Sequence, residues 1–245
     1  MPLIELANPT RFLTFAERAL PWLAGATALA FAFGLNQALF VAPDDYQQGA
    51  TVKIMFIHVP SAWLGMFIWG VMSIAALGTL VWRHPLADVA GKSAAPIGAM
   101  FTFLCLTTGS LWGRPMWGTY WVWDARLTSV LVLFLMYLGV VALWRTVEDP
   151  SRAGRAAAIL TLVGAVNLPI IKFSVDWWNT LHQAASVVRL GGPKIHPAIL
   201  TPLLIMAVAF TLLFITLHLA AMRNEILRRR IRTLRLMQAE AAPGR

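Results

Sequence analysis

The chain has 245 residues, of which 58% are hydrophobic and 13% are charged, and its formal net charge is +9. An average soluble domain is about 25% charged, so this composition excludes an ordinary soluble protein and indicates one compact membrane-embedded bundle. Cys105 is the only cysteine in the sequence, which excludes an internal disulfide and a Cys-x-x-Cys redox pair.

Stretches without Asp, Glu, Lys or Arg predict the membrane-spanning helices of an all-α protein. A helix needs about 20 apolar residues to cross the hydrocarbon core. The stretches that meet or approach this length are 19–42, 54–82, 93–113, 127–144, 156–171 and 195–222. The fifth is short, but Arg155 and Lys172 at its ends can extend their charged groups to the membrane surface. We therefore predict a single six-span domain over residues 1–245.

The distribution of positive charge predicts the orientation in the membrane. If both termini lie inside, six of the 20 Lys and Arg residues lie outside: Lys53, Arg114, Arg126, Lys172, Arg189 and Lys194. The positive-inside rule therefore predicts cytoplasmic termini. The segment 223–245 holds an arginine cluster, and we expect it to continue the last span as a basic helix. Contact with anionic lipid is the favoured reading of this tail, and a nucleic-acid arm is the alternative.

A tryptophan-rich segment on the predicted outer side carries the strongest functional signal. Residues 117–124 read Trp-Gly-Thr-Tyr-Trp-Val-Trp-Asp, and Trp112 lies just before them. Indole faces stack on flat apolar groups, and each indole N–H donates one hydrogen bond. In a short interfacial helix, Trp117, Trp121 and Asp124 would share one face. An aromatic belt is the alternative, but the density of indoles favours a platform for a large planar ligand.

Two histidines are predicted to flank this platform. His58 lies near the outer start of the second span, and His182 lies in the outer loop before the sixth. Imidazole is a common protein ligand of heme iron, and two imidazoles at one depth can hold an iron from both faces. A polar anchor at the interface is the alternative. His196 is a weaker competitor, whereas His84 and His218 fall on the inner side, where we expect structural roles.

Two arginines bracket the tryptophan-rich segment. Arg114 and Arg126 could form bidentate hydrogen bonds with the carboxylates of a bound ligand, such as heme propionates. The alternative is that both side chains reach from the membrane to the polar interface, and the sequence favours neither reading.

These residues resemble the heme exporter protein C (CcmC) family of cytochrome c maturation. The resemblance is carried by the segment 117–124, by Phe-Ile-His-Val-Pro-Ser-Ala-Trp at 56–63 and by Leu-His-Gln at 181–183, and it extends over nearly the whole chain. It implies that His58 and His182 are the axial ligands of heme iron. The other ligand-contacting residues that we predict are Trp112, Arg114, Trp117, Gly118, Trp121, Trp123, Asp124 and Arg126.

The resemblance also implies a function and a set of partners. It implies a protein of the bacterial inner membrane that is not an enzyme, and that binds heme b on its periplasmic face and delivers it to the heme chaperone CcmE. The implied complex contains the ABC-type ATPase CcmA, the membrane subunit CcmB and the small subunit CcmD. Whether heme crosses the bilayer through this chain or enters from outside stays open.

The sequence leaves two other functions open. A b-type heme oxidoreductase subunit would bury its two histidines near the middle of the membrane, whereas here they lie at the outer ends of spans. A small-molecule permease without heme would carry ionisable groups within its spans, and these spans hold almost none besides histidine. Both are therefore less favoured than heme binding for transfer.

Overall fold

The computed structural model describes residues 7–183, 186–187, 189 and 191–241. No β-strand element occurs among these residues, and helices account for most of them. The elements in chain order are α1 (Pro9–Asn36), η2 (Gln37–Val41), η3 (Ala50–Ile54), α2 (Met55–Leu80), α3 (Ala87–Trp117), α4 (Ala125–Thr146), α5 (Pro150–Gly164), α6 (Asn167–Trp177) and α7 (Pro197–Ala241). The prediction of an all-α membrane protein is confirmed.

The described residues contain six helical segments that are long and apolar enough to cross a membrane. They coincide with the six predicted stretches, and each extends past at least one end because charged residues also occupy terminal helical turns. The fifth segment, Pro150–Trp177, consists of α5 and α6 with a break at Ala165–Val166. Pro169 lies in the first turn of α6, where the missing N–H costs no helical hydrogen bond. The whole fifth segment is therefore long enough to span.

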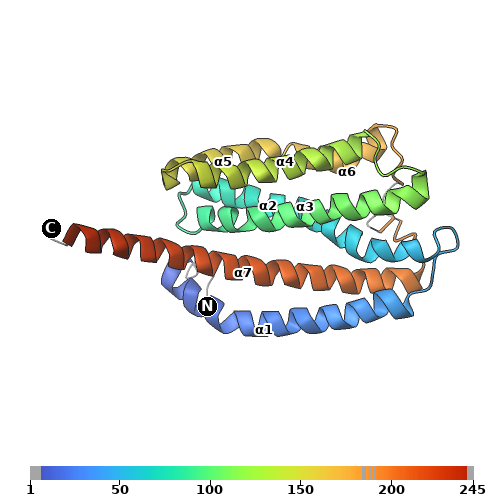
Figure 1. Cartoon of the computed structure of the whole chain (residues 1–245), viewed down its shortest axis with the longest axis horizontal. Helices are drawn as coiled ribbons and strands as arrows, with labels where there is room; N and C mark the ends of the chain where they lie inside the picture. Colours follow the sequence, from blue (N-terminus) through green and yellow to red (C-terminus); the bar gives the residue numbers. More distant parts are fainter. Residues whose placement is uncertain (1–6, 184–185, 188, 190, 242–245) are drawn as a thin grey trace.

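The helices pack in three groups along a common direction (Figure 1). The pair α2 and α3 lies in the middle, α1 and α7 lie on one side, and α4, α5 and α6 lie on the other. Buried polar side chains join the middle pair to the group of α4, α5 and α6. Trp69 donates from Nε1 to the Thr161 carbonyl at 3.0 Å, and the Tyr137 hydroxyl donates to the Gly65 carbonyl at 2.8 Å. These bonds satisfy polar atoms that would otherwise be costly to bury.

The two ends of the bundle differ in what they carry. The start of α1 and the far part of α7 lie at one end, at the left of Figure 1. The connections 42–49 and 118–124 and the described residues between α6 and α7 lie at the opposite end, which we call the loop end. The predicted continuation of the last span is confirmed, because α7 runs unbroken to Ala241. The rest of the predicted tail, residues 242–245, lies outside the described residues.

Candidate functional site

The tryptophan-rich segment links α3 to α4 at the loop end, and it is not helical beyond Trp117. Gly118 ends α3 in a left-handed conformation (φ 77°), and its N–H donates to the Arg114 carbonyl at 3.0 Å. The chain then runs without regular structure to Asp124, which caps α4 by accepting from the Leu127 N–H at 2.7 Å. The expected short helix is therefore wrong, because a helix-ending glycine follows the first indole.

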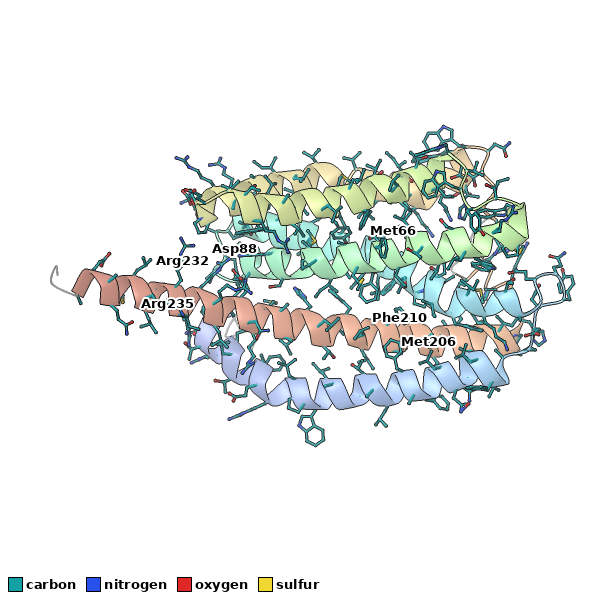
Figure 2. The ribbon with its side chains drawn as sticks, viewed as in Figure 1. Met66, Asp88, Met206, Phe210, Arg232 and Arg235 are labelled. Carbon is teal, nitrogen blue, oxygen red and sulfur yellow. The ribbon has the colours of Figure 1, made fainter. Side chains whose placement is uncertain are left out.

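Two adjoining cavities lie at the loop end. The deep cavity, of about 560 Å³, extends along the bundle as far as Thr102 and Leu133, and Met66, labelled in Figure 2, also lines it. The outer cavity, of about 440 Å³, reaches Gln48 and Trp112. The residues that line both cavities are His58, Ala62, Gly109, Trp117, Arg126, Lys172 and His182. The structure thus brings together the two predicted iron ligands, one indole and one of the two arginines.

His58 is held by the neighbouring span. Its Nδ1 lies 3.1 Å from the Cys105 carbonyl oxygen and 3.1 Å from the Thr108 hydroxyl. A carbonyl only accepts, so it favours the tautomer in which Nδ1 carries the proton and Nε2 keeps its lone pair. Gly109 permits the close approach, since a Cβ there would stand 2.8 Å from Cε1 of His58.

His182 approaches from the loop after α6. Its ring packs edge-on against Trp117, with centroids 4.8 Å apart, and its Nδ1 lies 3.6 Å from Oδ2 of Asp124. Both of these atoms are buried and lack a hydrogen-bond partner. Burial lowers the pKa of His182 and the Asp124 carboxylate partly offsets this, while Arg126 adds to the lowering. The neutral imidazole, which is the form that binds a metal, is therefore favoured.

The two arginines occupy different environments. Arg126 lines both cavities and donates to the Ser174 hydroxyl at 3.0 Å and to the carbonyls of Ile171 and Lys172 at 3.3 Å. Arg114 is exposed, donates to the Gly118 carbonyl and lies over the Tyr120 ring at 5.5 Å. Arg114 lines neither cavity, so its predicted contact with the ligand has no geometric support.

The four indoles also separate into different groups. Trp117 lines both cavities, and Trp121 lines the deep one with a buried Nε1 that has no partner. Trp112 lines the outer cavity and donates from Nε1 to Gln48 at 2.9 Å. Trp123 is 75% exposed and packs edge-on against Trp121, and it lines neither cavity. Gly118 likewise lines neither cavity and serves the turn.

The remaining histidines are engaged elsewhere. His196 is exposed, and its Nδ1 accepts from the Ala198 N–H at 3.2 Å, beside the first turn of α7. His84 and His218 lie towards the end of the bundle that carries the termini. His84 accepts from the Leu86 N–H at 3.3 Å, and Nε2 of His218 lies 3.0 Å from the Ala90 carbonyl. These contacts agree with the structural roles that we expected for His84 and His218.

Sequence reasoning missed several residues of the site. Cys105 and Thr108 orient His58, and Gly109 makes room for it, yet all three lie in the apolar third span. Thr108 and Gly109 are consecutive residues about two turns after the midpoint of α3, and no motif distinguishes them. Lys172 was predicted only to reach the membrane surface from the end of a span, and it lines both cavities.

The fold and the site together define a multi-pass membrane protein with two imidazoles that line the same indole-lined cavities at one end. The family model described as heme exporter protein C (CcmC) matches residues 2–237. The chain is 77% identical over 239 residues to heme exporter protein C of Bradyrhizobium diazoefficiens, a match that covers 98% of this chain and 90% of the relative. This protein therefore belongs to the heme exporter protein C family.

More distant relatives carry the same description. Heme exporter protein C of Escherichia coli K12 is 49% identical over 91% of this chain and 90% of its own length. That of Paracoccus denitrificans is 44% identical over 96% of this chain and 97% of its own length. Together with the six candidate spans, these matches identify a multi-pass bacterial membrane protein.

Proposed function

We propose that this protein binds heme b between His58 and His182 and delivers it to the chaperone CcmE during the biogenesis of c-type cytochromes. Membership of the heme exporter protein C family gives it a role in heme handling for that process. The observation that carries the proposal is the pair of imidazoles. They come from distant elements and line the same two cavities, and each has Nδ1 near a protein acceptor, at 3.1 Å in His58 and at 3.6 Å in His182.

The roles of the two imidazoles follow from their neighbours. A histidine that ligates a metal through Nε2 usually donates from Nδ1 to a carbonyl or a carboxylate, which fixes the ring and raises its basicity. His58 has the Cys105 carbonyl for this purpose, and His182 has the Asp124 carboxylate. Asp124 lies behind His182 and lines neither cavity, so we assign it to positioning His182 and not to contacting heme.

The porphyrin ring would take the space between the indoles. Trp117 and Trp121 provide aromatic surface in the deep cavity, and Trp112 provides it in the outer cavity. Arg126 and Lys172 are the cationic groups that line both cavities and suit the propionates. The exposed Trp123 is better placed to meet a partner at the rim than to contact the ring.

We further propose the location and the complex in which heme is handled. The excess of Lys and Arg on the side of the termini supports cytoplasmic termini and a periplasmic loop end in the inner membrane. Family membership supports an exporter complex with other Ccm subunits, for which CcmA, CcmB and CcmD are the proposed members. In this arrangement CcmE would collect heme at the periplasmic loop end.

The test is the absorption spectrum of the protein purified with its heme. We expect a six-coordinate low-spin spectrum for the unaltered protein. His58→Ala and His182→Ala should each give five-coordinate or weakly held heme, whereas His84→Ala should not change the spectrum. Unchanged spectra for both of the first two variants would refute the axial assignment.

A b-type redox subunit is the second candidate, since it would also use two histidines. It predicts heme that cycles between ferrous and ferric states and stays bound when CcmE is present. Transfer of heme to added CcmE, followed in the same sample, favours the delivery function.

A further inference from the structure

The far part of α7 is longer than a membrane span requires. At about 1.5 Å per residue, a helix of 45 residues is about 67 Å long, whereas the hydrocarbon core is about 30 Å thick. The last buried residue of α7 is Ile226, and every side chain from Arg230 to Ala241 is exposed. Figure 1 shows this part of α7 extending beyond all the other helices.

A cluster of ion pairs holds α7 where it leaves the bundle. The carboxylate of Glu225, only 5% exposed, accepts from Lys92 at 2.7 Å, from Arg228 at 2.6 Å and from Arg229 at 3.0 Å. Arg229 also pairs with Asp88 at 2.8 Å. Since α7 contains no Gly or Pro after Pro202, the helix continues beyond this cluster without a hinge residue.

The projecting helix has two distinct stripes. Leu227, Ile231 and Leu234 follow the i, i+4, i+7 spacing of one helical face, and the last two are 51% and 58% exposed. A second stripe, Arg228, Arg232 and Arg235, lies beside the first. Figure 2 places Arg232 and Arg235 on the part of α7 beyond the bundle.

A shallow groove runs along α7 beside the arginine stripe, and Leu227 and Ile231 of the apolar stripe line it, whereas Leu234 does not. It has a volume of about 540 Å³, and both apolar and arginine side chains line it. An exposed apolar stripe is ordinary where lipid surrounds a span, but this one lies on the charged part of α7 that follows Met222, about five helical turns up to Ala241. In water such a stripe calls for a covering partner.

We propose that this face of α7 is a docking surface for an acidic amphipathic helix of another protein. The apolar stripe supplies the contact area, and the arginine stripe selects carboxylates. A second copy of this chain would bring arginine against arginine, which is unfavourable. A lipid surface would require α7 to bend away from its axis, and no residue that favours a bend lies between Arg223 and Ala241.

A binding experiment on the full-length protein tests the proposal with two defined probes. One is a synthetic helical peptide with leucines at i, i+3, i+4 and i+7 and glutamates on both flanks, and the other is a phosphatidylglycerol vesicle. We expect the peptide to bind the protein in neutral-lipid nanodiscs, and Ile231→Glu to weaken this binding about 10-fold or more. Thr233→Glu is the matched control, because it adds the same charge off the stripe, and it should leave peptide binding within about twofold.

If the peptide does not bind, or binds Ile231→Glu and Thr233→Glu alike, the stripe is not a protein docking surface. Association of the projecting helix with the vesicles alone would assign it to lipid. Heme content of both variants should equal that of the unaltered protein, so that a failure here is distinct from a failure of the heme site.

A crosslinking experiment in intact membranes provides an independent readout. A photo-reactive residue at Leu234 should crosslink to a protein segment rich in Asp and Glu, and one at Thr233 should do so far less. Arg232→Glu with Arg235→Glu should abolish the crosslink, and charge reversal in the identified segment should restore it. Crosslinks to lipid only, or a crosslink unaffected by the charge reversal, would contradict the proposal.

Discussion

At the scale of single residues, the two imidazoles of the site are held in unequal ways. His58 is fixed to the neighbouring span by a backbone carbonyl and a hydroxyl at 3.1 Å. His182 lies on a connecting loop, with the Asp124 carboxylate at 3.6 Å, which is longer than a hydrogen bond. A carboxylate raises the basicity of an imidazole more than a neutral carbonyl does, so a shortening of this contact would strengthen His182 as a ligand.

Replacement of Asp124 should affect transfer more than binding. We expect Asp124→Ala to retain more heme than His182→Ala, because both imidazoles remain, but to deliver less heme to CcmE. Heme content and CcmE-bound heme are measured in the same membranes. Since Asp124 also caps α4, the capping loss of about 1 kcal/mol must be separated from the effect on His182.

Asp124→Asn provides that separation, because asparagine caps a helix as well as aspartate does but carries no charge. Impaired transfer in both variants would assign the effect to the carboxylate beside His182. If Asp124→Asn transfers normally and Asp124→Ala does not, the acid only caps the helix. Normal transfer by both variants would mean that Asp124 has no role in transfer and that only the tryptophans of the segment 117–124 contribute.

A methyl group at Gly109 should displace His58. The added Cβ would stand 2.8 Å from Cε1 of the imidazole, closer than real contacts allow. We expect Gly109→Ala to reduce the six-coordinate fraction of the heme spectrum towards that of His58→Ala. Gly91→Ala is the control on the same helix, because its Cβ would meet only Ala75 at 3.9 Å; an equal effect of both changes would mean that α3 as a whole was destabilised.

At the scale of elements, the segment between α3 and α4 shows what the sequence could and could not predict. The uncharged stretches predicted all six spans, because the hydrocarbon core selects apolar length. The prediction that Trp117 and Trp121 share one helical face was wrong, because Gly118 takes a left-handed conformation and ends α3. An argument from residue spacing assumes a continuous helix, so it cannot predict where the backbone changes direction.

The candidate site was predictable only in part, for a related reason. Motifs identified His58, His182 and the indoles, since such residues are rare in apolar surroundings. The backbone carbonyl of Cys105 and the space left by Gly109 carry no motif, since any residue has a carbonyl and glycine is common in spans. Packing between α2 and α3 therefore decides which nitrogen of His58 remains free.

The indoles should contribute to heme retention in a graded way. An aromatic contact is worth about 0.5–1.5 kcal/mol beyond its buried area, so Trp117→Ala or Trp121→Ala alone should weaken heme retention several-fold. The combined change of both should cost far more. Trp123→Ala is the matched control, because that side chain is exposed and lines neither cavity. Heme dissociation rates in detergent provide the measurement, and an effect of Trp123→Ala equal to the others would contradict the assignment.

At the scale of the whole molecule, the orientation in the membrane connects the site to its function. A reporter enzyme that works only in the periplasm should be active when fused after Thr119 or after Gly191, and one that works only in the cytoplasm should be inactive there. Fusions after Arg83 and Glu148, in the connections near the opposite end of the bundle, should show the reverse. Cytoplasmic activity at Thr119 would place the heme site on the wrong side for delivery to CcmE.

The helix α3 gives the molecule a mechanical link between its two ends. Near its start, Asp88 and Lys92 are tied to α7 through Arg229 and Glu225. Near its other end, some 40 Å away by helical rise, it carries Trp112 and Trp117, which line the ligand cavities. A displacement of α7 at one end of the bundle would therefore be transmitted along α3 to the aromatic side chains that line the cavities at the other end.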